Sequence, residues 1–311
     1  MKKTIAYLAL AGVTGLALAN AATYPAVGEK TLQVGGQIEA RVHGLTEKSV
    51  LAGGISHRIY EGGDAQKPTL VLLHGYSADK DVWPRFAAHL VKDFHIVIPD
   101  MAGHGETGFH KDWTYDIPSQ AARIVALMDE MGVDKFHVAG NSMGGFITAT
   151  LAANYPGRVM SATAIDPAGV MPPVASKMDK MIAAGQNPFE VQDRAQFDAF
   201  YAMTMAKPPY MPKFVLDGLA KTYQDRREEL AVIYQGFHRK DMLDNRLADI
   251  KVPFFLIWGK KDELLDVSSV SVWQAGVPGI KVHVFEELGH MPMVEAPKAT
   301  ADVVGGFLKS I

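Results

Sequence analysis

The chain has 311 residues, of which 48% are hydrophobic and 21% are charged, a composition that supplies a large apolar core and excludes a disordered chain. Its formal net charge of -3 provides no basic surface, so nucleic acid is not expected as a partner. The absence of cysteine excludes disulfides, a cysteine nucleophile and cysteine metal ligands.

Residues 1–21 have the pattern of a cleavable signal peptide. Two lysines precede an apolar stretch at 5–19, and the sequence ANA at 19–21 fits the A-x-A cleavage site. The stretch is shorter than the ~20 residues that a spanning helix needs, although an uncleaved anchor is the alternative. We therefore expect an exported protein that is periplasmic, associated with the outer membrane or secreted.

The following elements alternate between strand and helix patterns. An alternating segment from Gln37 to Tyr60 predicts an antiparallel hairpin. Continuous apolar runs, typical of strands buried on both faces, come next at 69–73, 95–98, 136–139, 159–165, 254–258 and 282–285. Helices are expected between and after these strands, at about 81–91, 119–131, 143–155 and 296–308. The alternation predicts an α/β fold with a mostly parallel, doubly wound sheet.

Residues 167–250 interrupt this alternation. They contain no buried-strand run and are broken by MPP, NPF and KPPYMP. We interpret this segment as a helical cap inserted after the sixth strand, between a first part of the core at 22–166 and a second part at 251–311. In open α/β sheets ligands bind beyond the carboxyl ends of the strands, so the cap is expected over the binding site.

The sequence GNSMG at 140–144 matches the G-x-S-x-G pattern of a nucleophile turn. A sharp turn from a strand into a helix exposes the hydroxyl of Ser142, and the two glycines leave room for the turn. The motif follows one predicted strand and opens one predicted helix, as this chemistry requires. Ser142 is therefore the predicted nucleophile.

Serine needs a base and an acid partner. His290 lies in ELGHMPMVEAP, after the last predicted strand, and is the predicted base. Asp262 follows the strand FFLIW in WGKKDELLD and is the predicted acid, which gives the chain order serine, acid, histidine. Asp166 also ends a strand and is the alternative acid.

The transition state of acyl transfer also needs donors for an oxyanion. Backbone amides of the residue after the nucleophile and of a loop after the third strand supply them in this type of site, which assigns Met143 and Tyr76. GHGETG at 103–108 matches a dinucleotide pattern, yet no apolar helix opens there. We expect neither a cofactor nor a metal.

Together, six segments resemble the α/β-hydrolase family, and they are most similar to its monoacylglycerol-lipase-like branch and related bacterial lipases. The segments are HGYSADKDVW, DMAGHG, GNSMGG, IDPAG, WGKKDELLDV and LGHMPMVEAP. The resemblance covers about 37–308 and implies a triad of Ser142, Asp262 and His290. It also implies oxyanion amides at Tyr76 and Met143, and a lid-like cap over an acyl pocket.

We therefore expect a serine ester hydrolase that cleaves acyl esters or lipids through an acyl-enzyme. The cap is also a candidate for transient contact with a lipid surface. One alternative is a hydrolase of carbon-carbon bonds in vinylogous diketones, which a buried cap arginine would favour; Arg194, Arg226, Arg227 and Arg239 are available. The other alternative is a non-catalytic binding protein on a hydrolase scaffold.

Overall fold

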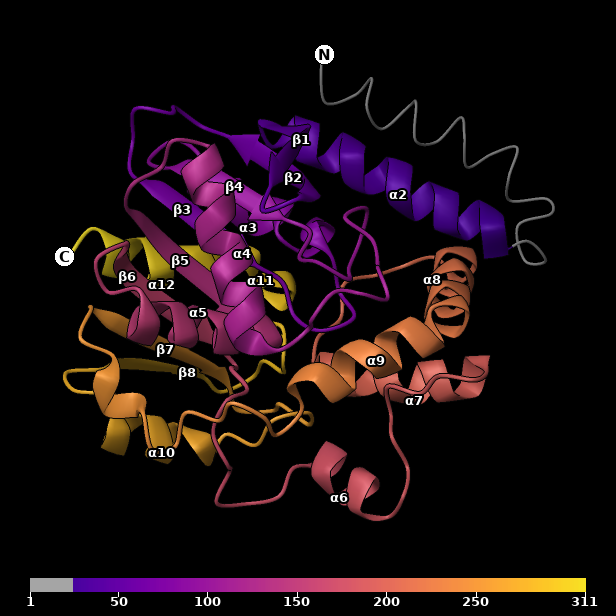
Figure 1. Cartoon of the computed structure of the whole chain (residues 1–311). Coiled ribbons are helices and arrows are strands. Elements are labelled where there is room, and N and C mark those ends of the chain that lie inside the picture. The colour runs from indigo at the N-terminus through magenta and orange to yellow at the C-terminus, as the bar shows by residue number, and fades with distance from the viewer. Residues whose placement is uncertain (1–24) are drawn as a thin grey trace.

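A single sheet crosses the molecule (Figure 1). The computed structural model describes residues 25–311, and the sheet has eight strands in the order β1-β2-β4-β3-β5-β6-β7-β8. The pairs β1–β2 and β2–β4 are antiparallel, and every neighbouring pair from β4 to β8 is parallel. The predicted mostly parallel sheet is confirmed. The strands are β1 (Leu45–Ala52), β2 (Ile55–Gly62), β3 (Thr69–Leu73), β4 (His95–Pro99), β5 (Phe136–Asn141), β6 (Val159–Ile165), β7 (Phe254–Gly259) and β8 (Lys281–Phe285).

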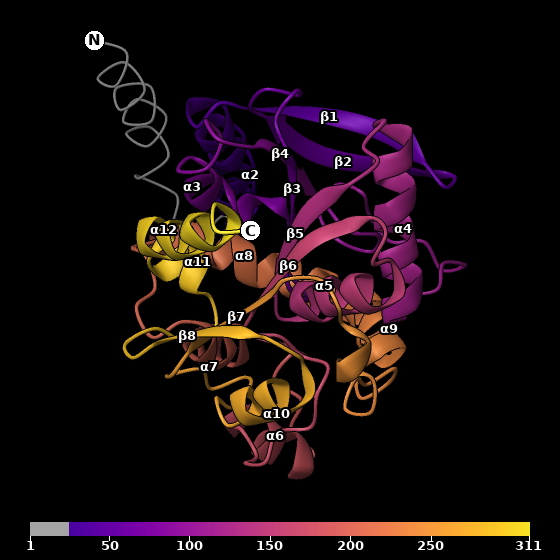
Figure 2. The ribbon, with the colours of Figure 1, turned by 90° about the vertical axis from the view of Figure 1, so that its left-hand side faces the viewer.

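Helices cover both faces of the sheet. Figure 2 shows α3, α11 and α12 on one side and α4 and α5 on the other. The helices of the core are α2 (Pro25–Val42), α3 (Pro84–Ala87), α4 (Ile117–Glu130), α5 (Met143–Asn154), α10 (Ser269–Gly276), α11 (Pro292–Glu295) and α12 (Pro297–Leu308), with short 3-10 turns η2 (Lys80–Val82) and η3 (Leu247–Asp249).

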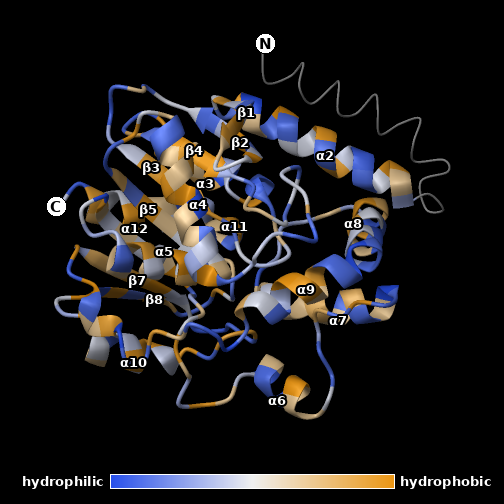
Figure 3. Cartoon of the chain, in the orientation of Figure 1, coloured by the Kyte–Doolittle hydropathy of each residue, from blue (hydrophilic) through white to orange (hydrophobic). Residues whose placement is uncertain are grey.

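The continuous apolar runs are explained by burial on both faces. Because successive side chains of a strand point to opposite faces, Val71 and Leu73 of β3 join the core under α4, α5 and α10, while Leu70 and Leu72 join the core under α3 and α12. Figure 3 shows the same contrast, with apolar strands inside and mixed helices outside.

The helices α6 (Lys177–Ala183), α7 (Arg194–Thr204), α8 (Lys213–Asp225) and α9 (Arg227–Phe237) lie between β6 and β7 in the chain. They form the helical cap expected after the sixth strand (Figure 1). Its interior is aromatic, since the Tyr223 ring lies 5.5 Å from that of Phe197 and 5.4 Å from that of Phe200. The domain boundaries at 166–167 and 250–251 stay a prediction.

Two predicted elements were wrong. The segment from Gln37 to Val42 is not a strand of the hairpin but the end of α2, and the hairpin begins at Leu45. The helix expected at about 81–91 is divided into η2 and the short α3. Pro84 occupies a first-turn position of α3, where its missing amide hydrogen costs no helical hydrogen bond.

Helix α2 packs on the cap helix α8 through two glycines. A Cβ atom at Gly28 would lie 1.8 Å from the carbonyl oxygen of Phe214, and one at Gly218 would lie 2.2 Å from the amide nitrogen of Glu29. The two backbones therefore approach too closely for any side chain at the crossing. This contact joins the beginning of the described chain to the cap.

The GHGETG segment forms a loop around Asp100. The carboxylate of Asp100 accepts hydrogen bonds from the amides of Lys80 (2.8 Å) and Glu106 (2.9 Å) and from the Lys80 ammonium (2.9 Å). A Cβ atom at Gly105 would lie 2.2 Å from the Asp100 carboxyl carbon. The glycines of this segment thus allow a tight turn around the buried ion pair of Lys80 and Asp100.

The predicted signal peptide lies outside the described residues. Within residues 25–311, none of the helices combines the length and the apolar character needed to cross a membrane.

Candidate active site

Ser142 stands at the turn between β5 and α5, with φ 58° and ψ -117°. A residue other than glycine in such a sparsely populated region costs of order 1–3 kcal/mol and is typical of functional sites. The flanking glycines are required by sterics, because a Cβ atom at Gly140 would lie 2.2 Å from the carbonyl oxygen of Gly144. A Cβ atom at Gly144 would lie 2.3 Å from the carbonyl oxygen of Leu73. The backbone here has the geometry that the G-x-S-x-G pattern predicts.

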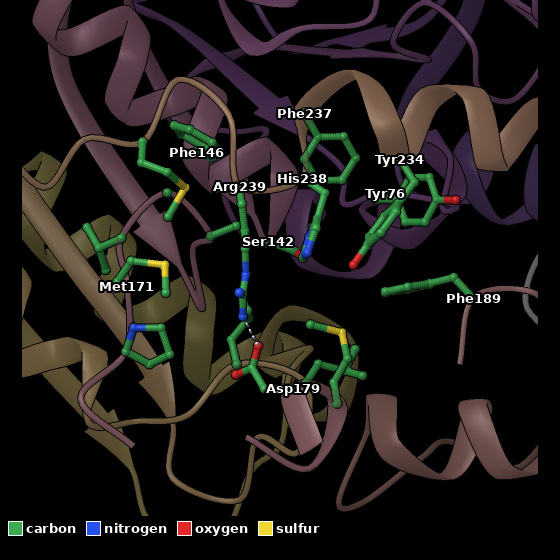
Figure 4. Close-up of a pocket in the computed structure, with 18 residues that line it drawn as sticks. Tyr76, Ser142, Phe146, Met171, Asp179, Phe189, Tyr234, Phe237, His238 and Arg239 are labelled. Atoms are coloured by element: carbon green, nitrogen blue, oxygen red, sulfur yellow. Dashed lines mark hydrogen bonds and ion pairs between the residues drawn. The ribbon is translucent and has the colours of Figure 1, made fainter. Parts of the chain in front are cut away.

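Ser142 lines a pocket between the core and the cap (Figure 4). Most of the lining side chains are apolar. They include Phe146, Val170, Met178, Phe189, Met242 and Leu264. Such a surface suits the acyl chain of an ester, since it offers apolar contact and few hydrogen-bond partners.

The structure brings Asp262 and His290 together. The Nδ1 atom of His290 lies 2.7 Å from Oδ2 of Asp262, and both side chains are buried. Because a carboxylate only accepts, Nδ1 carries the hydrogen, and Nε2 has the lone pair of the neutral imidazole. The other oxygen of Asp262 accepts from the amides of Leu264 (2.7 Å) and Leu265 (3.0 Å). The carboxylate is therefore held by its own loop with one oxygen facing the histidine.

Asp166 has a different partner. Its Oδ1 atom accepts a hydrogen bond from the amide of Gly259 (2.8 Å), at the end of β7. The hydrogen bond to His290 goes to Asp262, as preferred from the sequence, and not to Asp166.

The histidine loop is attached to the serine turn by Asn141. Its side-chain amide donates to the carbonyl oxygens of His290 (2.8 Å) and Ile165 (3.2 Å). Glu295 holds the same loop from the other side by accepting from the amide of Gly289 (2.8 Å). Within residues 25–311, no hydrogen bond joins Ser142 Oγ to the imidazole, and such catalytic contacts often form only with substrate bound. The sequence reasoning missed Asn141 and Glu295, although Asn141 is one of the two variable residues inside the motif.

The backbone amides of Tyr76 and Met143 are available as donors. Neither donates to another protein atom of the part of the chain that the structure describes, and Met143 opens α5, where the first amides have no helical partner. A Cβ atom at Gly75 would lie 3.2 Å from that of Ser142. The loop carrying Tyr76 therefore runs directly beside the serine.

His74 orders this loop. Its Nδ1 atom donates to the carbonyl oxygen of Gly75 (2.8 Å), and Nε2 accepts from the amide of Met101 (3.0 Å). Complete burial lowers the pKa of His74, so the imidazole is kept neutral. The side chain of Tyr76 reaches the cap and donates its hydroxyl to the carbonyl oxygen of Leu230 in α9 (2.7 Å).

Charged and polar side chains from the cap line the same pocket, and of these only Arg239 had been considered from the sequence. They are Asp179, His238 and Arg239. Figure 4 shows Arg239 extending across the pocket toward Asp179, and the two side chains lie 3.4 Å apart. Of the four cap arginines considered from the sequence, Arg239 alone lines this pocket, and its side chain is half exposed rather than buried.

One group of side chains has the spacing of metal ligands. Single ligand atoms of Asp166, Asp262 and His290 all lie within 4.8 Å of one another. However, Nδ1 of His290 and Oδ2 of Asp262 lie 2.7 Å apart, which is a hydrogen-bond distance and shorter than the ~3.4 Å that separates two ligand atoms of a tetrahedral site with ligand distances of about 2.0–2.2 Å. We assign this group to hydrogen bonding.

Comparison with known proteins gives the family. Residues 68–297 match the family model of the alpha/beta hydrolase fold. The chain is 32% identical over 309 residues to "Lipase 1" of Psychrobacter immobilis, which covers 98% of this chain and 96% of that protein. It is 31% identical over 262 residues to the monoacylglycerol lipase abhd6-B of Xenopus laevis, covering 80% and 78%. A crystal structure described as a membrane phospholipase A, a novel bacterial virulence factor, is similar with a TM-score of 0.88 and 34% identity over 100% of this chain and 99% of that one.

The chain therefore belongs to the α/β-hydrolase family, as its motifs indicated. Within that family it is an enzyme of the lipase and esterase type, a carboxylic ester hydrolase.

Proposed function

We propose that the protein hydrolyses acyl esters of lipid type through an acyl-enzyme on Ser142, with His290 as base and Asp262 as acid. The observation that supports this most directly is the strained serine turn, which lines an apolar pocket and is joined through Asn141 to the loop of a buried histidine bonded to a carboxylate. The mechanism requires no cofactor.

The reaction follows from the positions of these groups. With an ester in the pocket, Nε2 of His290 takes the proton of Ser142 while Oγ attacks the carbonyl carbon. Asp262 keeps the hydrogen of the imidazole on Nδ1 and stabilises the cation that forms. The amides of Tyr76 and Met143 donate to the oxyanion, and His290 then protonates the leaving alcohol. In the second half of the cycle the same imidazole activates water against the acyl-enzyme.

The proposal is tested by replacing the nucleophile. Ser142→Ala is expected to lower kcat on p-nitrophenyl esters by roughly 10⁴-fold or more, because only binding and the oxyanion donors remain. The Ser142→Ala protein should also lose covalent labelling by a fluorophosphonate, while the wild type is labelled once per chain. Ser271→Ala, on exposed surface of α10, is the matched control and should retain both properties. Normal esterase turnover in the Ser142→Ala protein would exclude the assignment.

The carbon-carbon bond alternative would be favoured by a buried cap arginine, but Arg239, the one of the four that lines the pocket, is half exposed and lies 3.4 Å from Asp179. Arg226 donates to the carbonyl oxygen of Gly103, and Arg194 pairs with Asp198 and Asp217. A binding protein without activity would need no strained serine and no bonded acid and base. We therefore retain ester hydrolysis as the one proposed function.

The rim of the pocket also supports contact of the cap with a lipid surface. Met171 lines the pocket and is 45% exposed, and Val174, three residues further on, is 52% exposed. Exposed apolar side chains in this segment would insert among lipid chains and bring the pocket close to the substrate. Together with the predicted signal peptide, this surface fits an exported enzyme that works at a lipid interface.

A further inference from the structure

We propose that Asp166 is a positioning residue: it stays a neutral carboxylic acid and donates a hydrogen bond to the carboxylate of Asp262. This inference rests on the proposed function, because it concerns the acid partner of His290. It gives a role to Asp166, which the sequence analysis kept as the alternative to Asp262.

Asp166 is fixed in place by backbone. It follows the end of β6 with φ 43°, a left-handed conformation that aspartate and asparagine tolerate better than most residues. Its amide donates to the carbonyl oxygen of Ile257 (2.8 Å), and its Oδ1 atom accepts from the amide of Gly259 (2.8 Å). The side chain is completely buried between β6 and β7, so its second oxygen has no access to water.

The carboxyl group of Asp166 lies close to other ionisable groups. Ligand atoms of Asp166, Asp262 and His290 lie within 4.8 Å of one another. Among the described residues, Oδ2 of Asp166 has no hydrogen-bond donor. Two adjacent buried carboxyl groups cannot both ionise at low cost, so one of them retains a proton.

The hydrogen-bond donors decide which carboxyl group is charged. Asp262 receives three donors, from the amides of Leu264 and Leu265 and from the imidazole of His290. Asp166 receives one, from Gly259. Each donor stabilises an anion more than a neutral acid, so the negative charge belongs on Asp262 and the proton on Asp166.

The electrostatic surroundings agree with this assignment. Burial first, and then the neighbouring charge of Asp262, raise the pKa of Asp166 well above its ordinary value. The carboxylate of Glu295, in α11, acts in the same direction, and the Gly259 amide opposes it. The facing titratable groups are thus Asp262, His290 and Glu295. The Asp166 hydroxyl becomes a fourth donor to Asp262, which limits rotation of that carboxylate and moderates its negative charge beside the imidazole.

Two variants separate this role from others. Asp166→Asn keeps an oxygen for the Gly259 amide and an amide donor for Asp262, and asparagine accepts a positive φ. Asp166→Gly also accepts that backbone conformation but removes the donor. We expect Asp166→Asn to lose no more than a few-fold in kcat and Asp166→Gly on the order of tenfold, because only the glycine variant loses the hydrogen bond to the charged Asp262.

The pH dependence of kcat/KM gives a readout that a purely structural role would not move. In Asp166→Gly the negative charge of Asp262 is no longer moderated by a hydrogen bond, so it stabilises the protonated imidazole of His290 more strongly. The acid limb of the kcat/KM profile should therefore move to higher pH by about half a unit or more. In Asp166→Asn the limb should stay near that of the wild type. If Asp166 were instead ionised, Asp166→Asn would remove a negative charge beside His290 and move the limb to lower pH. That shift, or equal profiles for the two variants, would overturn the proposal.

A measurement independent of turnover distinguishes this proposal from the proposed function. Infrared difference spectra of wild type against Asp166→Gly and Asp166→Asn at neutral pH should contain the carbonyl stretch of one protonated carboxyl group. Absence of this band would reject the neutral acid even if Ser142 proves to be the nucleophile. If the band is present but the Ser142→Ala variant is fully active, the neutral acid is retained and only the proposed function is rejected. If Asp166→Gly does not fold, Asp166→Asn supplies both readouts.

Discussion

His57, on strand β2, is a buried imidazole that must stay neutral in the fold. Burial first, and then the charge of Arg123, lower its pKa to about 4. An unfolded histidine binds its proton near pH 6.5. Between these two values the unfolded chain therefore holds more protons at this site than the folded chain, and the stability falls as the pH falls.

We expect His57→Leu to remove this part of the acid sensitivity. The free energy of unfolding of the variant, relative to that of the wild type, should rise as the pH is lowered from 6.5 toward 4, by up to ~1.4 kcal/mol per pH unit. Urea midpoints measured between pH 4 and pH 8 give this difference. His110→Leu, at an exposed histidine, should follow the wild type, and a constant difference for His57→Leu would show that this imidazole is already charged in the fold.

Some of the candidate site residues could be predicted from the sequence, and others could not. Ser142 was identifiable because its turn needs a fixed local pattern of glycines. Choosing between Asp262 and Asp166 was harder, since both end a parallel strand and the sequence does not show which carboxyl group collects more donors. Arg239 was one of four cap arginines considered, and His238 was not, because nothing in a cap sequence indicates which side chains point into the pocket.

At the scale of elements, continuous apolar strands were the most predictable feature. The runs at 69–73 and 159–165 match β3 and β6 residue for residue, because a short, continuous apolar run with clear ends is typical of a buried parallel strand. The segment from Gln37 to Val42 failed for the opposite reason. Ile38 and Val42 fit both an alternating strand and one face of a helix, and α2 is stabilised by a contact with α8 that lies far along the chain.

The glycine crossing of α2 and α8 allows a matched test of that contact. Gly28→Ala places a Cβ atom against the backbone of Phe214, so the helices must separate, and we expect a loss of about 1–3 kcal/mol in stability. Gly35→Ala in the same helix meets no atom within 4 Å and should gain up to ~1 kcal/mol from helix propensity. Urea denaturation of both variants measures the difference.

This pair of variants also shows whether α2 supports the cap. If separation of the helices disturbs α8, Gly28→Ala should raise KM for long-chain esters more than for acetate esters, while Gly35→Ala leaves both unchanged. Equal stability of the two variants would mean that α2 and α8 do not touch in solution.

At the scale of the whole molecule, the core and the cap supply different parts of the candidate site. The core supplies the ends of β5, β7 and β8, where the predicted nucleophile, acid and base lie. The cap supplies most of the pocket wall, and it also holds the predicted oxyanion loop through Tyr76, whose hydroxyl donates to the carbonyl oxygen of Leu230. Under the proposed function, we therefore expect binding of the acyl chain and positioning of the Tyr76 amide to be coupled through α9.

A pocket walled by apolar side chains makes chain length the main determinant of affinity. Each methylene that enters it is worth ~0.8 kcal/mol, or roughly fourfold in kcat/KM. We expect kcat/KM for p-nitrophenyl esters to rise by up to this factor for each added carbon and then to reach a plateau where the chain meets the far wall.

Shortening a wall residue should move that plateau. Met242 lines the pocket and is partly buried, so Met242→Ala is expected to extend the rise by two or more carbons while lowering kcat/KM for short esters by a few-fold through lost contact. Met160→Ala is the control, since Met160 is 40% exposed on β6 and does not line the pocket. If the two variants gave the same chain-length profile, the acyl chain would have to bind elsewhere than between Met242 and Ser142.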